Sequence, residues 1–245
     1  MFFVVGARGV RRLDTSLSGE TSELEAVSSS QALPQRYSAP SRWNQDWERR
    51  LRVLLGEEHV LYRRGLQLAL ANEPDIEIVG EASTGEEVLT QVELKHPDIV
   101  LLDVRMPLLS GPEVVRRIRE SHPDVQTIII TSKESEASLV DAFRAGALGY
   151  IAEGDETTRL AEAVRQVAGG NVVIDPRLGL ALAAYLQDKQ AQLHAYLLSP
   201  LENEVLRLLT TGNTSRQIAE GLAISPDTAT QLIRAIFEKI GSATR

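Results

Sequence analysis

The 245-residue chain contains no cysteine. This absence excludes disulfides, thiolate nucleophiles and Cys-ligated zinc sites, and it fits a reducing compartment. No apolar run reaches the roughly 18–20 residues that span a bilayer, and the run at residues 1–5 is too short for a secretory signal. The chain also lacks a G-x-G-x-x-G loop and a nucleophile–base pair. We therefore expect a cytoplasmic protein that has no membrane partner and is not an enzyme.

The acidic balance of the chain is unevenly distributed. The formal net charge is −8, and residues 51–175 contain 12 Lys and Arg against 22 Asp and Glu. Residues 198–245 contain five of each kind and are neutral. Because nucleic acid repels an acidic surface, we do not expect the middle of the chain to bind it.

Residues 1–50 are predicted to be a disordered extension. The stretch 15–41 is rich in Ser, Glu, Pro and Gln and has no sustained hydrophobic period. Two interpretations stay open for it: a flexible regulatory arm, or an over-extended start of the reading frame.

From residue 51 onward, strand and helix patterns alternate. Apolar runs predict strands at 51–55, 76–82, 99–103, 125–131 and 149–152. Helical patterns follow them at 60–71, 86–95, 112–121, 134–145 and 157–168. Five βα units with short loops predict an α/β fold, with a doubly wound parallel sheet and helices on both faces.

The pattern changes at residue 176. Residues 178–197 are apolar at helical spacing and predict an interdomain helix within a linker at 176–197. Residues 198–245 predict an all-α module with helices at 200–209, 215–222 and 226–240. Two helices joined by a short turn, the second of them long, are typical of a helix-turn-helix.

Polar side chains gather at the predicted carboxyl edge of the sheet. Asp103 ends the apolar run 99–102, and Glu57, Glu58 and His59 follow the first strand. Thr131 ends the fourth strand, and Glu153 follows the fifth. Open α/β sheets bind ligands at this edge, so we expect these groups to converge there.

These residues carry a resemblance to a known family. The stretches Leu54-Leu55-Gly56-Glu57-Glu58-His59 and Leu101-Leu102-Asp103-Val104-Arg105-Met106-Pro107, together with Thr131 and Gly146-Ala147-Leu148-Gly149-Tyr150, resemble the receiver domain of two-component response regulators. Leu198-Ser199-Pro200, Glu204-Val205-Leu206, Gly212, Ile218-Ala219 and Ile224-Ser225 resemble the LuxR-type helix-turn-helix. The resemblance covers about residues 51–241 and matches the NarL/FixJ architecture, with a flavodoxin-like receiver at 51–175.

The resemblance implies a phosphorelay chemistry. Asp103 would accept a phosphoryl group from a sensor histidine kinase. Glu57, Glu58 and Asp103 would hold Mg²⁺, a hard cation that prefers oxygen ligands. Thr131 and Tyr150 would form the switch that links the site to the surface.

Three residues depart from the family pattern. The family usually has aspartates at the positions of Glu57 and Glu58, and the extra methylene moves each carboxylate by roughly 1–1.5 Å, although Mg²⁺ tolerates little distortion. Glu153 replaces the family's lysine, and reversing that charge costs on the order of 4 kcal/mol per close pair at an effective dielectric constant near 20. We therefore hypothesise that Asp103 is phosphorylated slowly or not at all.

The resemblance implies that the long C-terminal helix enters the major groove of DNA. Thr230 stands where the family usually has a lysine. The residues expected to contact DNA are Arg216, Thr228, Thr230, Gln231, Arg234 and Lys239. We expect a homodimer formed through the receiver or the helix at 178–197. The leading hypothesis is a DNA-binding transcriptional response regulator. The alternatives are a pseudo-receiver regulator that works without phosphorylation, or an interaction protein that has lost DNA binding.

Overall fold

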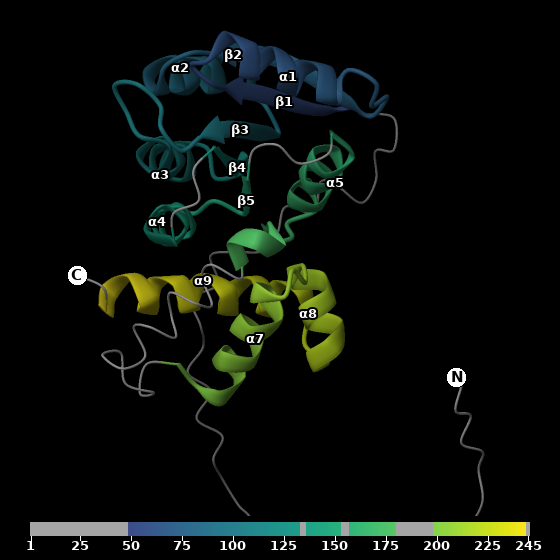
Figure 1. Ribbon diagram of the computed structural model, residues 1–245, viewed down its shortest axis with the longest axis vertical. Helices are drawn as coiled ribbons and strands as arrows, with labels where there is room; N and C mark the ends of the chain where they lie inside the picture. Colours follow the sequence, from purple (N-terminus) through teal and green to yellow (C-terminus); the bar gives the residue numbers. More distant parts are fainter. Residues whose placement is uncertain (1–48, 133–135, 153–156, 180–197, 244–245) are drawn as a thin grey trace, which may run out of the picture. The chain divides into compact units, whose positions relative to one another are not determined.

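The computed structural model describes residues 49–132, 136–152, 157–179 and 198–243 (Figure 1). The predicted extension up to residue 48, most of the interdomain helix (180–197) and Glu153 lie outside the described residues. The strands are β1 (Leu51–Gly56), β2 (Ile76–Ala82), β3 (Ile99–Asp103), β4 (Gln126–Thr131), β5 (Gly149–Ala152) and β6 (Val173–Ile174). The helices are α1 (Val60–Leu70), α2 (Gly85–Lys95), α3 (Gly111–Ser121), α4 (Glu136–Ala145), α5 (Thr157–Ala168), α7 (Pro200–Thr210), α8 (Ser215–Leu222) and α9 (Pro226–Ala243).

The strands form one parallel sheet in the order β2-β1-β3-β4-β5-β6. Every residue of β3 is buried, as expected for a strand whose two faces are both covered by helices. At the edge strand β2 the pairing skips one residue: Val53 lies opposite Ile78, but Leu54 lies opposite Gly80. Val79 is therefore an extra residue of β2, as in a β-bulge.

Helices cover both faces of the sheet. Helix α1 contacts α5 on one face, whereas α2 contacts α3 and α3 contacts α4 on the other (Figure 1). Local signals explain where these helices begin. Thr84 Oγ1 accepts a hydrogen bond from the N–H of Glu87 at the start of α2, and Pro112 lies in the first turn of α3.

The sheet has one strand more than the sequence predicted. Strand β6 pairs with β5, with Gly149 opposite Val173 and Tyr150 opposite Ile174. Two residues are too few to produce a periodic pattern, which explains why this strand was missed. The predicted fold class, a doubly wound parallel sheet followed by a helical module, is confirmed.

The C-terminal module consists of α7, α8 and α9, and its helix-turn-helix arrangement agrees with the prediction. Capping boxes at Ser199 and Thr214 start α7 and α8. The side chain of Ser225 accepts a hydrogen bond from the N–H of Thr228 (3.0 Å) and caps α9. Phe237 of α9 is fully buried and stacks on Phe143 of α4, with ring centroids 4.5 Å apart. Among the described residues, no helix is long and apolar enough to cross a membrane.

Candidate functional site

Asp103 lies at the carboxyl end of β3, where the sequence predicted it. Its residue surface is 3 % exposed, and its Oδ1 accepts a hydrogen bond from the backbone N–H of Arg105 at 3.0 Å. Burial raises the pKa of Asp103, and the nearby charge of Glu57 raises it further, while the hydrogen bond from Arg105 acts in the opposite direction. The carboxyl group is therefore held in place by the backbone that follows the strand.

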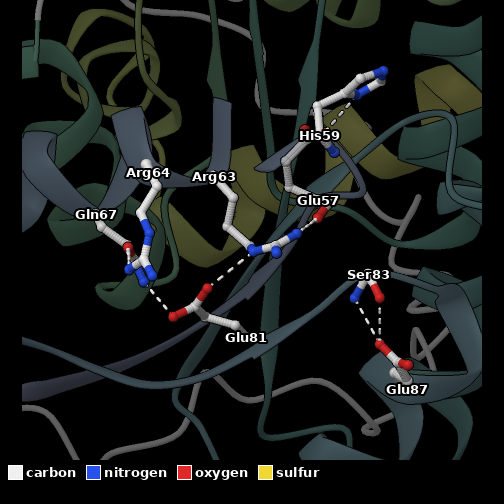
Figure 2. Close-up of polar contacts among 8 residues, drawn as sticks. All are labelled: Glu57, His59, Arg63, Arg64, Gln67, Glu81, Ser83 and Glu87. Carbon is white, nitrogen blue, oxygen red and sulfur yellow. Dashed lines mark hydrogen bonds and ion pairs between the residues drawn. The ribbon is translucent and has the colours of Figure 1, made fainter. Parts of the chain in front are cut away.

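Glu57 directly follows β1 and is 1 % exposed. Its Oε1 accepts a hydrogen bond from the backbone N–H of His59 at 2.7 Å. The same oxygen lies 2.9 Å from the ring nitrogen Nδ1 of His59 (Figure 2). The hydrogen bond to Glu57 raises the pKa of His59. The glutamate is long enough to fold back on the loop and satisfy an N–H at the start of α1.

Glu57, His59 and Asp103 form a cluster in which one potential ligand atom from each residue lies within 4.8 Å of the others. The predicted metal ligands Glu57 and Asp103 are thus brought together. Glu58 is not part of this cluster: its side chain is 41 % exposed, and its Oε1 lies 3.6 Å from His59 Nε2. The two buried carboxylates suit Mg²⁺, which is often held by one or two carboxylates plus waters, whereas the imidazole nitrogen does not.

A chain of polar contacts extends from this cluster along α1 and β2. Arg63 donates one hydrogen bond to the backbone oxygen of Glu57 and another, at 2.9 Å, to Oε2 of Glu81. Figure 2 shows the Arg63 side chain between these two partners, with Gln67 and Arg64 beyond Glu81. These contacts hold the loop that carries Glu57 against the edge of the sheet.

Thr131 ends β4, the strand that pairs with β3, one residue beyond the partner of Asp103. Tyr150 lies in β5, on the other side of β4. Thr131 is buried, and Tyr150 is completely buried. Burial raises the pKa of Tyr150 to about 12, although the side chains of Thr131 and Ser138 act in the opposite direction. The aromatic ring is therefore turned inward, with its hydroxyl near Thr131. The resemblance pairs these two residues as the switch.

Arg105 is a cation beside the site that sequence reasoning missed. Its backbone is bonded to Asp103, and its guanidinium Nη2 donates to Oγ of Ser132 at 3.0 Å. The guanidinium acts to lower the pKa of Asp103. His59 was expected at this edge of the sheet, but its contact with Glu57 was not. The available signal was the spacing, since an acidic side chain often accepts the N–H two residues later and so places that residue beside the carboxylate.

The residues predicted to contact DNA fall into two groups. Arg216, Thr228 and Gln231 are exposed, as DNA contact requires. Thr230 is half-buried, and its hydroxyl donates to the backbone oxygen of Gly170 at 3.4 Å. Arg234 is also half-buried.

Lys239 has a structural partner instead of a free charge. Its ammonium group lies 2.7 Å from both carboxylate oxygens of Glu202. Burial alone would raise the pKa of Glu202, but hydrogen bonds from Lys239 and Ser199 outweigh it and bring the pKa below its ordinary value. Lys239 therefore ties α9 to α7.

Comparisons with known proteins agree with this geometry. Residues 53–165 match the response regulator receiver domain, and residues 196–245 match the LuxR family of bacterial regulatory proteins. The transcriptional activator DevR/DosR of Mycobacterium tuberculosis is 34% identical over 198 residues, which are 80% of this chain and 90% of the relative. The nitrate/nitrite response regulator NarL of Escherichia coli is 31% identical over 195 residues, 79% of this chain and 90% of the relative.

A solved structure shows the same fold. A two-component response regulator of the LuxR family from Aurantimonas matches 56% of this chain and 97% of its own, with a TM-score of 0.53 and 26% identity. The chain therefore belongs to the two-component response regulators of the NarL/FixJ type, which join a receiver domain to a LuxR-type helix-turn-helix.

Proposed function

We propose that this transcriptional response regulator is controlled through Asp103, which accepts a phosphoryl group from a sensor histidine kinase. One observation carries the proposal: Asp103 is a buried carboxylate at the carboxyl end of the central strand β3, and it lies beside a second buried carboxylate, Glu57. The cluster of Glu57, His59 and Asp103 is called the notch from here on. We take the receiver to extend over residues 51–175, after an extension at 1–50. A linker at 176–197 connects it to the helix-turn-helix at 198–245.

Each group of the notch has a role in this proposal. An oxygen of Asp103 forms the new bond to phosphorus while the bond between phosphorus and the donor breaks. Glu57 and Asp103, with Glu58 at the rim, would hold Mg²⁺, which when bound neutralises charge on the phosphoryl oxygens. Thr131 donates its hydroxyl to a phosphoryl oxygen, and Tyr150 follows Thr131.

The output of the proposed switch is DNA binding by a homodimer. Thr228 and Gln231, whose side chains are exposed, would read bases from α9, and the exposed Arg216 would contact phosphate. Thr230 and Arg234, which are both half-buried, are included in the proposed surface. Thr230 becomes available only if α9 moves away from the contact that Thr230 makes with Gly170. Lys239 is the least supported of the proposed DNA contacts, because Glu202 already neutralises its charge.

Incubation with acetyl phosphate and Mg²⁺, followed by intact mass measurement, tests the acceptor. We expect a slow gain of one phosphoryl group by the wild type and no gain by Asp103→Asn. Glu153→Lys restores the family's cation and should speed the gain. Incorporation into Asp103→Asn at the wild-type rate would contradict the assignment.

A second candidate is a pseudo-receiver that controls transcription without phosphorylation. Two observations favour it: Tyr150 is already turned inward, and Glu57 is engaged by the N–H of His59. Genome-wide DNA capture separates the two candidates. Identical binding maps for wild type and Asp103→Asn support the pseudo-receiver, whereas loss of sites in the variant supports phosphorylation. If neither the wild type nor Asp103→Asn enriches any DNA site, the result would favour an interaction protein without DNA binding.

A further inference from the structure

The notch contains a nitrogen ligand that a magnesium site does not need. Nδ1 of His59 lies 2.9 Å from Oε1 of Glu57. Tetrahedral metal–ligand bonds of about 2.0–2.2 Å place two ligand atoms on one ion about 3.3–3.6 Å apart. Glu57 and His59 are joined by a hydrogen bond slightly shorter than this spacing, so the two groups lie close enough to share one ion when a metal replaces the bridging proton, and Asp103 offers a third atom within 4.8 Å.

The two carboxylates are fixed before any ion arrives. The N–H of His59 holds Glu57 at 2.7 Å, and the N–H of Arg105 holds Asp103 at 3.0 Å. Both carboxylates are buried, whereas the side chain of His59 is 61 % exposed. Metal binding would therefore order mainly the exposed imidazole ring, which limits the loss of conformational entropy.

The glutamate at position 57 is what brings the imidazole into the cluster. Its carboxylate reaches far enough to contact both the N–H and the ring of His59. A carboxylate one methylene shorter extends about 1–1.5 Å less from the backbone, which is enough to break the contact with the His59 ring, although the N–H contact can persist, as it does at Asp103. The departure that weakens an all-oxygen site thus creates a mixed nitrogen–oxygen site.

We propose that Glu57, His59 and Asp103 bind a divalent transition-metal ion, of which Zn²⁺ is the best-suited example, with His59 as the nitrogen ligand. Imidazole suits Zn²⁺, Cu²⁺, Ni²⁺ and iron, whereas Mg²⁺ prefers oxygen. Three protein ligands leave a position open for water or a phosphoryl oxygen. The inference concerns the same notch as the proposed phosphorylation, but it rests on the donor atoms alone.

Metal titration of the full-length protein tests the proposal without a phosphoryl donor or DNA. Zn²⁺ affinity is measured by competition with a chromophoric chelator, and Mg²⁺ affinity by calorimetry. We expect one Zn²⁺ per chain. His59→Ala and His59→Gln should each lower the Zn²⁺ affinity at least about tenfold and leave Mg²⁺ affinity within about twofold.

His122→Ala is the matched control, because His122 is a partly exposed histidine at the end of α3 with a carboxylate, Glu93, at 4.0 Å. It should leave Zn²⁺ affinity unchanged. Circular dichroism confirms that each variant is folded. Unchanged Zn²⁺ affinity in both His59 variants, an equal loss in His122→Ala, or no stoichiometric Zn²⁺ binding would overturn the proposal. Any of these results leaves phosphorylation of Asp103 open, and a lack of phosphorylation leaves the metal site standing.

Discussion

Two residues of the notch, His59 and Arg105, share one geometric origin. Each follows an acidic residue by two positions, and its N–H donates to that carboxylate. A turn that satisfies a buried carboxylate in this way also delivers the side chain of the donating residue to the site. The charge and ligand properties of the notch therefore depend on Glu57 and Asp103 and equally on the residues two places after them.

Arg105 should supply part of the positive charge that the family's lysine provides and that Glu153 does not. We expect Arg105→Ala to slow phosphoryl incorporation from acetyl phosphate about threefold to tenfold, because a charge near the acceptor is lost. Arg105→Lys should keep most of the rate. The time course of intact mass measures this. Arg116→Ala serves as the control, since Arg116 is paired with Glu113 on α3. Equal rates for Arg105→Ala and wild type would refute the role.

At the residue scale, the sequence predicted that Glu57 and His59 meet Asp103 at one edge of the sheet, and it missed Arg105. Asp103 and Glu57 could be placed because each follows a buried apolar strand, and parallel strands end at one edge. The displacement of Glu58 from the cluster could not be predicted, because it depends on which of two adjacent side chains points into the notch. The partner of Lys239 was equally hidden, since Glu202 is 37 residues away in the chain.

At the level of elements, the ion pair between α7 and α9 holds the helix-turn-helix together. Lys239→Ala would leave the buried carboxylate of Glu202 without its cation, and we expect a loss of about 1–3 kcal/mol in the free energy of unfolding. Urea denaturation followed by circular dichroism measures it. Arg207→Ala removes a similar pair on the exposed face of α7, with Glu204, and should change stability far less. Comparable losses in both variants would contradict this assignment.

The same pair predicts a pH dependence. Because the pKa of Glu202 lies below its ordinary value of 4.5 in the folded protein, the folded state binds this proton less readily than the unfolded state. The pair therefore stabilises the protein above pH 4.5, and the contribution disappears as the pH falls through the lowered pKa. Glu202→Gln should show a shallower loss of stability with acid than the wild type. Parallel curves would show that Glu202 does not contribute.

Helices and the longer strands were predictable because their apolar residues form a continuous run, as in β3, or recur at helical spacing, as in α3. Strand β6 was not, since its two residues acquire strand geometry only by pairing with Gly149 and Tyr150. Pairing of this kind depends on where α5 returns the chain, which no local pattern encodes.

On the scale of the whole molecule, charge is divided between an acidic receiver and a neutral helical module. With Lys239 engaged by Glu202, the proposed phosphate contacts of each chain reduce to Arg216 and Arg234. We expect a weak salt dependence of DNA affinity, with a slope of about −2 per chain in a plot of log K against log salt.

Fluorescence anisotropy at several salt concentrations measures this slope. Arg216→Ala should reduce its magnitude by about 1, while Arg116→Ala in the receiver should leave it unchanged. A steep slope that does not respond to Arg216→Ala would place the DNA contacts elsewhere.

The extra residue of β2, Val79, has a consequence for self-association. The outer side of an edge strand presents main-chain groups that can template the growth of a sheet from one molecule into the next. Val79 interrupts the two-residue repeat between Ile78 and Gly80, so a straight strand from a neighbour meets mismatched donors and acceptors halfway along. The bulge at Val79 thus helps to keep concentrated protein from polymerising through the edge strand β2.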